Sequence, residues 1–68
     1  MKIFENVKGY ANAKNAEKKL RSVLGDRIDD YAWHIGVNSN GRFYPVVSCI
    51  TQAGDIGWLA HSGICVTN

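Results

Sequence analysis

Residues 31–37 alternate between large apolar side chains and small or polar ones, and this segment constrains the fold more than any other. The large apolar positions are Tyr31, Trp33, Ile35 and Val37. Aromatic and β-branched residues at every second position are typical of a strand. Asn40 and Gly41 follow, and an Asn-Gly pair between two such segments is the strongest short signal of a β-hairpin. Residues 42–51 are therefore expected to form the returning strand.

A loop of two residues, Asn-Gly, sets the register of this hairpin and places Ile35 opposite Val46. One face of the sheet then carries the core side chains Tyr31, Trp33, Ile35, Val37, Tyr44, Val46 and Ile50. The opposite face carries Ala32, His34, Gly36, Phe43, Val47 and Cys49. This second face is too apolar to be fully exposed, so we expect part of it to be covered. Pro45 cannot donate a hydrogen bond and is expected at an outer edge or a bulge.

Residues 12–24 show the clearest helical pattern, because apolar residues recur there at spacings of three and four. These positions are Ala13, Ala16, Leu20, Val23 and Leu24. Asn12 is the expected N-cap, and Gly25 is the expected left-handed residue that ends the helix. Residues 26–30 are expected to be a polar connection. Together with the strands, the apolar residues Leu20, Val23, Leu24, Trp33, Ile35 and Val46 are predicted to be largely buried.

Three shorter elements complete the prediction. Asp55 begins a helix over residues 55–61, residues 64–66 form a last strand, and residues 2–7 form a short strand or an ordered arm. The order is therefore β-α-β-β-α-β, without the first strand if that segment is only an arm. This order predicts an α+β fold, in which helices pack on one face of a small, mostly antiparallel sheet. A ferredoxin-like arrangement is one possibility.

The length of 68 residues predicts a single small domain, residues 1–68. An apolar content of 46% predicts a folded chain rather than a disordered one. The net charge of +2 excludes an acidic DNA mimic and is below that of a strongly basic nucleic-acid binder. We find no apolar signal-peptide core and no membrane-spanning segment. The expected location is therefore the cytoplasm, where cysteines stay reduced.

Three segments together carry a resemblance to known sequences. They are Gly9-Tyr10-Ala11-Asn12-Ala13-Lys14-Asn15-Ala16 with Lys19-Leu20, then 33–37 with 40–47, and finally 61–66. The combination resembles short uncharacterised proteins encoded by tailed bacteriophages. This resemblance implies a small accessory protein that acts in a bacterial cytoplasm by binding host or phage macromolecules. It carries over no activity, cofactor or functional residue.

Cysteine and histidine residues were considered as metal ligands or nucleophiles. The candidates are His34, Cys49, His61 and Cys65. Zinc sites usually contain pairs of cysteines separated by two to four residues, and no such pair is present. Both cysteines lie in apolar strand segments, which favours buried thiols that pack as small hydrophobic groups. We therefore expect no metal, no cofactor and no catalysis.

A basic segment is the candidate for nucleic-acid binding. Between residues 8 and 21 there are five positive side chains and a single acid, Glu17. The candidate contacts to phosphate are Lys8, Lys14, Lys18 and Arg21. The alternative is a helix face whose lysines only interact with solvent. The modest net charge argues against tight binding to nucleic acid.

Large apolar residues give a second candidate surface, for a protein partner. The candidates are Tyr10, Phe43, Val47 and Trp58. They also predict a symmetric dimer or a tight partner complex that buries the Phe43 side of the sheet, with Trp58 near its rim. In the alternative interpretation, Trp58 packs into the core. The expected function is thus non-enzymatic binding of a macromolecule, with a protein favoured over nucleic acid. Exposed aromatic side chains on the same face as the basic residues would favour nucleic acid instead.

Overall fold

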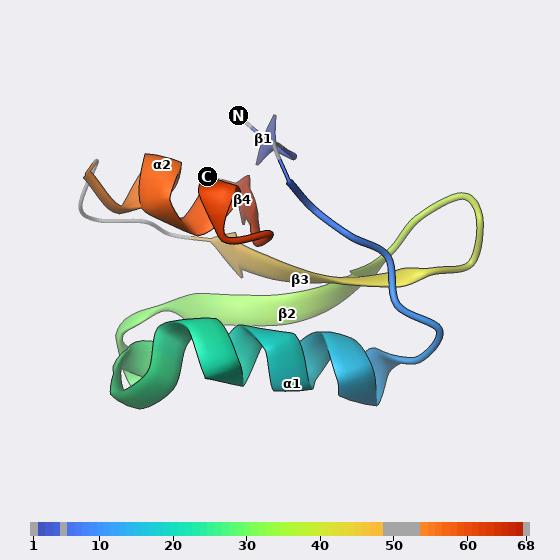
Figure 1. Ribbon diagram of the computed structural model, residues 1–68, viewed down its shortest axis with the longest axis horizontal. Helices are drawn as coiled ribbons and strands as arrows, with labels where there is room; N and C mark the ends of the chain where they lie inside the picture. Colours follow the sequence, from blue (N-terminus) through green and yellow to red (C-terminus); the bar gives the residue numbers. More distant parts are fainter. Residues whose placement is uncertain (1, 5, 49–53, 68) are drawn as a thin grey trace.

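The computed structural model describes residues 2–4, 6–48 and 54–67. The order of elements along the chain agrees with the prediction (Figure 1). The elements are β1 (Lys2–Ile3), α1 (Ala13–Leu24), the 3-10 helix η1 (Gly25–Asp30), β2 (Ala32–Val37), β3 (Phe43–Ser48), α2 (Gly54–His61) and β4 (Cys65–Thr67). The α+β class is therefore confirmed. The predicted strand residues 49–51 lie outside the described part of the chain.

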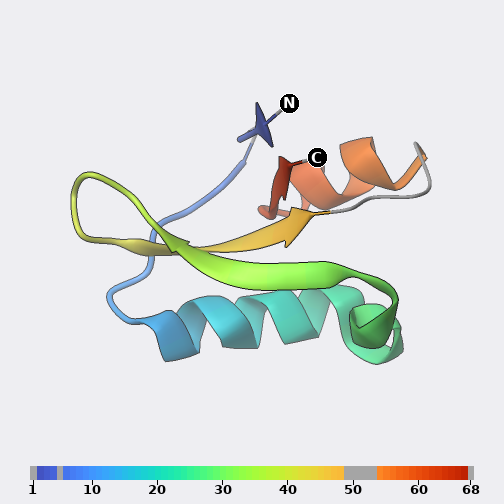
Figure 2. The same ribbon diagram turned by 180° about the vertical axis from the view of Figure 1, so that it is seen from behind.

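The strands form one mixed sheet with the order β1-β4-β3-β2. The pairs β1–β4 and β2–β3 are antiparallel, whereas β3–β4 is parallel. A parallel pair requires a crossover, and α2 provides it between β3 and β4. The ferredoxin-like arrangement is not found, because β4 lies between β1 and β3. The two ends of the chain consequently lie close together, with Lys2 paired to Thr67 (Figures 1 and 2).

The hairpin register differs from the prediction by one residue. Ile35 lies opposite Pro45, rather than opposite Val46. The loop has one residue more than predicted because the Asn38 side chain accepts hydrogen bonds from the backbone N–H groups of Asn40 and Arg42, at 2.9 and 3.0 Å. Gly41 takes a positive φ of 74°, as a three-residue hairpin loop requires.

This shift of one residue moves the β3 side chains to the other face of the sheet. Phe43 and Val47 therefore point toward the helices, while Tyr44 and Val46 point away from them. Val47 is completely buried in a core to which both helices contribute. The buried members of this core are Leu20, Leu24, Val47, Leu59, Ala60, Ile64 and Val66. The predicted assignment of Phe43 and Val47 to the face away from the helices is therefore wrong, because Val47 is buried in the chain's own core. The dimer stays a prediction.

The predicted core is confirmed in part. Leu20, Leu24 and Val46 are buried, whereas the other three predicted core residues are half-buried. Those three are Val23, Trp33 and Ile35. Val46 is buried on the face away from the helices, where the rings of Phe4 and Tyr44 contact each other edge to face at 5.7 Å.

Pro45 lies in an interior strand, so the prediction of an outer edge is wrong. The N–H of Phe43 points away from β2, toward Tyr10, and the nitrogen of Pro45 has the same direction because it lies two residues further along the strand. On that side β3 pairs with Tyr10 at Phe43 and with β4 from Val46 onward. Pro45 therefore lies between two pairing regions, where no ladder bond is lost.

The ends of α1 show one confirmed prediction and one correction. Asn12 is the N-cap, and its side chain accepts a hydrogen bond from the Asn15 N–H at 2.9 Å. Gly25 has φ 56° but ψ −129°, and the chain continues directly into η1 rather than into a polar connection. None of the helices in the ranges 2–4, 6–48 and 54–67 is long and apolar enough to span a membrane.

Candidate functional site

Three segments that are distant in sequence meet beside Tyr10. The backbone of Tyr10 pairs with Phe43 through two hydrogen bonds, of 2.7 Å from the Tyr10 N–H and 2.9 Å from the Phe43 N–H. Arg42 donates a further hydrogen bond to the Gly9 carbonyl at 3.1 Å. The segment between β1 and α1 is thus fixed to the hairpin, which places Tyr10 next to α1.

The turn after α2 forms the third side of this region. Asn6 donates from Nδ2 to the His61 carbonyl at 3.1 Å, which joins the N-terminal segment to the turn. Gly63 has φ 95°, and a Cβ there would lie 3.3 Å from the Asn6 carbonyl oxygen. A residue without a side chain therefore allows the turn to approach the N-terminal segment.

Two hollows open around Tyr10. The smaller has a volume of about 180 Å³ and is lined by Asn6, Lys8, Tyr10, Lys19, His61, Ser62 and Gly63. The larger has a volume of about 400 Å³ and is lined by Tyr10, Asn15, Lys18, Lys19 and Ser22. Tyr10 and Lys19 line both hollows, so the two form one surface, which we call the lysine groove.

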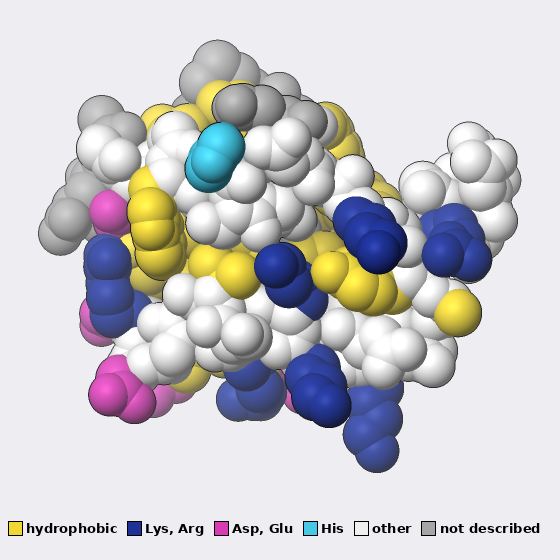
Figure 3. Space-filling model, in the orientation of Figure 1, with side chains coloured by type: hydrophobic (Ala, Val, Ile, Leu, Met, Phe, Trp, Pro, Cys, Tyr) yellow, Lys and Arg dark blue, Asp and Glu magenta, His cyan; other side chains and the backbone are white. Residues whose placement is uncertain are grey.

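The described residues that line the lysine groove carry a net positive charge. Among the described residues that line the two hollows there are three lysines and no aspartate or glutamate. Glu17, on the same helix, instead pairs with Arg21 at 3.2 Å. Figure 3 shows basic side chains across the centre and right of this face and acidic ones gathered mainly at the left. The arrangement favours an anionic ligand.

Two of the four predicted phosphate contacts line the lysine groove. Lys8 lines the smaller hollow and Lys18 the larger. Lys14 is exposed and is not part of either described lining. Arg21 lies elsewhere, with its guanidinium 5.5 Å from the centre of the Trp33 ring. Arg21 therefore does not belong to the groove.

Sequence reasoning missed several polar residues of the groove, among them Lys19, Asn15 and His61. Lys19 and Asn15 are four residues apart, and this spacing alone places them on one side of α1. His61 lies in the described lining of the smaller hollow. Its position there depends on the turn between α2 and β4, for which the sequence offers no comparable signal.

The predicted protein-binding residues do not form one patch. Tyr10 is half-buried in the lysine groove, and Phe43 is half-buried on the strand paired with it. Val47 is completely buried, so it cannot contact a partner, and this assignment is corrected. Trp58 is 43% exposed on α2 and therefore does not pack fully into the core.

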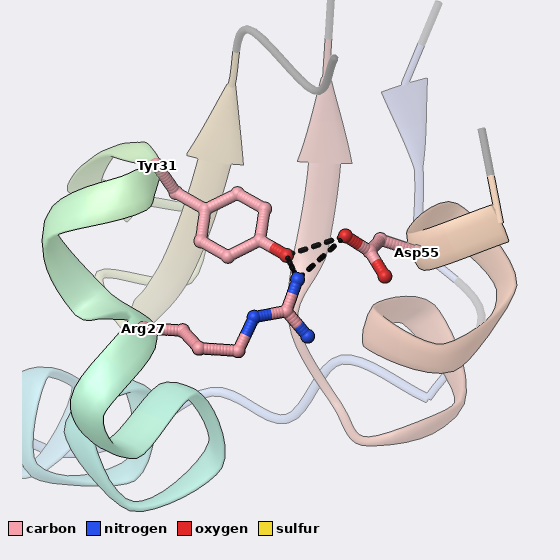
Figure 4. A network of polar contacts seen from close by, with 3 residues as sticks. All are labelled: Arg27, Tyr31 and Asp55. Carbon is pink, nitrogen blue, oxygen red and sulfur yellow. Dashed lines mark hydrogen bonds and ion pairs between the residues drawn. The ribbon is translucent and has the colours of Figure 1, made fainter. Parts of the chain in front are cut away.

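A polar network lies at the other end of α2, away from His61 (Figure 4). Tyr31 donates from its hydroxyl to Asp55 Oδ2 at 2.5 Å, and Arg27 donates to the same oxygen at 2.9 Å and also to the Tyr31 hydroxyl. The Arg27 guanidinium also lies 5.4 Å from the centre of the Tyr31 ring and 5.8 Å from that of Trp58. The network joins η1 to the first turn of α2.

The network shifts the pKa values of both acidic groups. The hydrogen bond from Tyr31 lowers the pKa of Asp55 below its ordinary value of 3.8, burial opposes this effect, and Arg27 adds to it. Burial, followed by the hydrogen bond to Asp55, raises the pKa of Tyr31 above 10.0. Both shifts favour an ionised carboxylate beside a neutral phenol, which is the state that holds η1 and α2 together.

The described residues offer no cluster of three or more His, Cys, Asp or Glu side chains that would suit a metal ion. Cys65 is buried in β4, and His34 is exposed on β2. The candidate ligand Cys49 lies outside the described residues.

Comparison with known proteins gives no relative for this arrangement. The sequence matches no protein-family model, no curated protein matches it significantly, and no solved structure matches it significantly.

Proposed function

We propose that this chain is a non-enzymatic binding protein whose lysine groove holds single-stranded nucleic acid through its phosphates. The observation that carries the proposal is a hollowed surface with Lys8, Lys18 and Lys19 and without an acid among its described lining residues. Lysines that lack a carboxylate partner can neutralise phosphates and release their counterions.

Tyr10 favours nucleic acid over an acidic protein as the ligand. Tyr10 lines both hollows, and Lys8 and Lys18 each line one of them. Proteins that bind single strands combine a positive groove with an aromatic ring on which bases stack. An aromatic ring on the same surface as the lysines is the arrangement expected for nucleic acid, and it reverses the order of preference drawn from the sequence.

The proposal is tested by fluorescence anisotropy with a short labelled single strand. The net charge of +2 predicts weak binding, with a dissociation constant of roughly 1–100 µM. Three phosphate contacts predict that affinity falls roughly 20-fold between about 50 mM and about 200 mM salt. Changing Lys8, Lys18 and Lys19 together to glutamine should abolish this binding.

The matched control is Lys14→Gln, which removes one charge from α1 outside the described groove lining. It should lower affinity by no more than about twofold. Equal losses in the triple variant and the control, or no binding by wild type at low salt, would refute the proposal.

A protein partner is the second candidate, and the exposure of Trp58 favours it. Trp58 is 43% exposed and its ring lies beside Arg27. Tryptophan and arginine are enriched among the residues that dominate protein interfaces. Trp58→Ala should leave nucleic-acid affinity unchanged because Trp58 is not in the described groove lining. The second function would be established if Trp58→Ala no longer binds a purified partner protein while the triple lysine variant still binds it.

A further inference from the structure

The smaller hollow is the more enclosed part of the lysine groove. Three separate segments border it: the N-terminal segment at Asn6 and Lys8, α1 at Lys19, and the turn at His61 to Gly63. The described lining of the larger hollow consists of Tyr10 and one side of α1, and this hollow is more open. We propose that the smaller hollow is a subsite for the terminal phosphate of a nucleic-acid strand. This inference rests on the proposed function of the groove.

The charge of the smaller hollow matches a terminal phosphate better than an internal one. An internal phosphodiester carries one negative charge, whereas a phosphomonoester carries about −1.5 to −2 at neutral pH. Lys8 and Lys19 line the hollow and carry two positive charges. Two cations around one enclosed volume are best neutralised by a dianion.

The neutral polar groups of this hollow are partly occupied by internal bonds. Ser62 donates its hydroxyl hydrogen to the Trp58 carbonyl at 2.9 Å, and Asn6 donates from Nδ2 to the His61 carbonyl. Recognition of an anion therefore depends mainly on the lysines, and these two bonds keep the turn in place. Because they do not involve Lys8 or Lys19, removing a lysine charge should leave the hollow intact.

The position of the larger hollow explains how the rest of the strand continues. Tyr10 and Lys19 are shared by the two hollows, so a strand whose end lies in the smaller hollow passes the Tyr10 ring and reaches Lys18. Lys8 contributes to the described lining of the smaller hollow alone, and Lys18 to that of the larger alone. Lys8→Gln and Lys18→Gln are therefore a matched pair of substitutions, because each removes one lysine from a different hollow.

The test compares three strands of one sequence with the same internal label: one with a 5′-phosphate, one with a 3′-phosphate and one with hydroxyl groups at both ends. One of the two phosphorylated strands should bind about tenfold more tightly than the hydroxyl strand, the difference expected for one charge-assisted contact. Lys8→Gln should remove most of this advantage. Lys18→Gln should weaken all three strands by a similar factor and leave the advantage unchanged.

The outcomes separate the subsite from the proposed function. If wild type binds all three strands with equal affinity, the terminal-phosphate subsite is wrong and nucleic-acid binding stands. If it binds none of them, the proposed function itself fails. A phosphoserine peptide that binds more tightly than either phosphorylated strand would overturn the inference in favour of a protein ligand. Equal melting temperatures for wild type and both variants exclude unfolding as the cause.

Discussion

The two ends of α2 use positive charge in opposite ways. At its first turn, Asp55 accepts hydrogen bonds from Arg27 and Tyr31, so the cation has a carboxylate partner and two neighbouring rings. At its last residue, His61 adjoins a hollow with two lysines and no described acidic neighbour. The comparison indicates that the paired cation holds elements together, whereas the unpaired lysines remain available to a ligand.

The Arg27–Asp55 pair differs from the other ion pair described in the chain. The Asp55 side chain is 18% exposed and that of Arg27 46%, and the pair links η1 with α2 across 28 residues of sequence. The Glu17–Arg21 pair, by contrast, joins two neighbouring turns of α1, and both its side chains are substantially exposed. A contact between distant segments resists unfolding more than one within a single helix, so these two ion pairs should differ in their contribution to stability.

The largest effect is expected from the core beneath both regions. Leu20 is completely buried and packs in the cluster that α1 and α2 share with the sheet. Leu20→Ala should lower the free energy of unfolding by about 2–5 kcal/mol, through lost burial and a cavity. Urea unfolding monitored by circular dichroism measures this change, and Leu20→Met is the volume-matched control. An unchanged midpoint for Leu20→Ala would show that this residue is not central to the core.

A smaller effect is expected when the paired region alone is altered. Asp55→Asn keeps the shape of the side chain but removes the charge that attracts Arg27, so the melting temperature should fall by several degrees. Glu17→Gln, at the exposed pair, should change it much less. Nucleic-acid affinity should be the same for Asp55→Asn as for wild type, because Asp55 lies at the opposite end of α2 from His61. A loss of affinity with retained stability would contradict the separation of the two regions.

The smallest effect is a dependence of stability on pH. The folded state lowers the pKa of Asp55, so its stabilising contribution is complete above about pH 4 and is lost as pH falls through the lowered value. The folded state raises the pKa of Tyr31, so that contribution is present below about pH 10 and is lost as pH rises through the raised value. Thermal melts of wild type and Asp55→Asn should therefore converge in acid. A constant difference between them across the acid range would assign the stabilisation to another group.

Local patterns predicted the elements of this fold but not their arrangement. The helical spacing over residues 12–24 and the Asn12 cap gave α1 correctly, since both depend only on near neighbours. The predicted hairpin register was wrong by one residue. The Asn38 side chain accepts hydrogen bonds from the backbone of Asn40 and Arg42, and this lengthens the loop by one residue. The position of β4 beside β3 was not predicted, because sequence alternation does not specify which strands become neighbours.

The candidate site shows the same division. The excess of lysine between residues 8 and 21 gave Lys8 and Lys18, which line the groove, and also Lys14 and Arg21, which are not among its described lining residues. Helix spacing alone could not decide which side of α1 faces the groove, because Tyr10 reaches its place through a backbone pair with distant Phe43. That information becomes available only once the chain is folded.

The Tyr10–Phe43 pair has a consequence for how a ligand would be received. Its two hydrogen bonds fix the backbone that carries the Tyr10 ring to β3, a strand that also pairs with β2 and β4. Because this backbone is already ordered, Tyr10 loses little backbone entropy when a base stacks on its ring, and this part of the cost of binding is reduced. Amide hydrogen exchange should accordingly show Tyr10 protected almost as strongly as the centre of the sheet before any ligand is added.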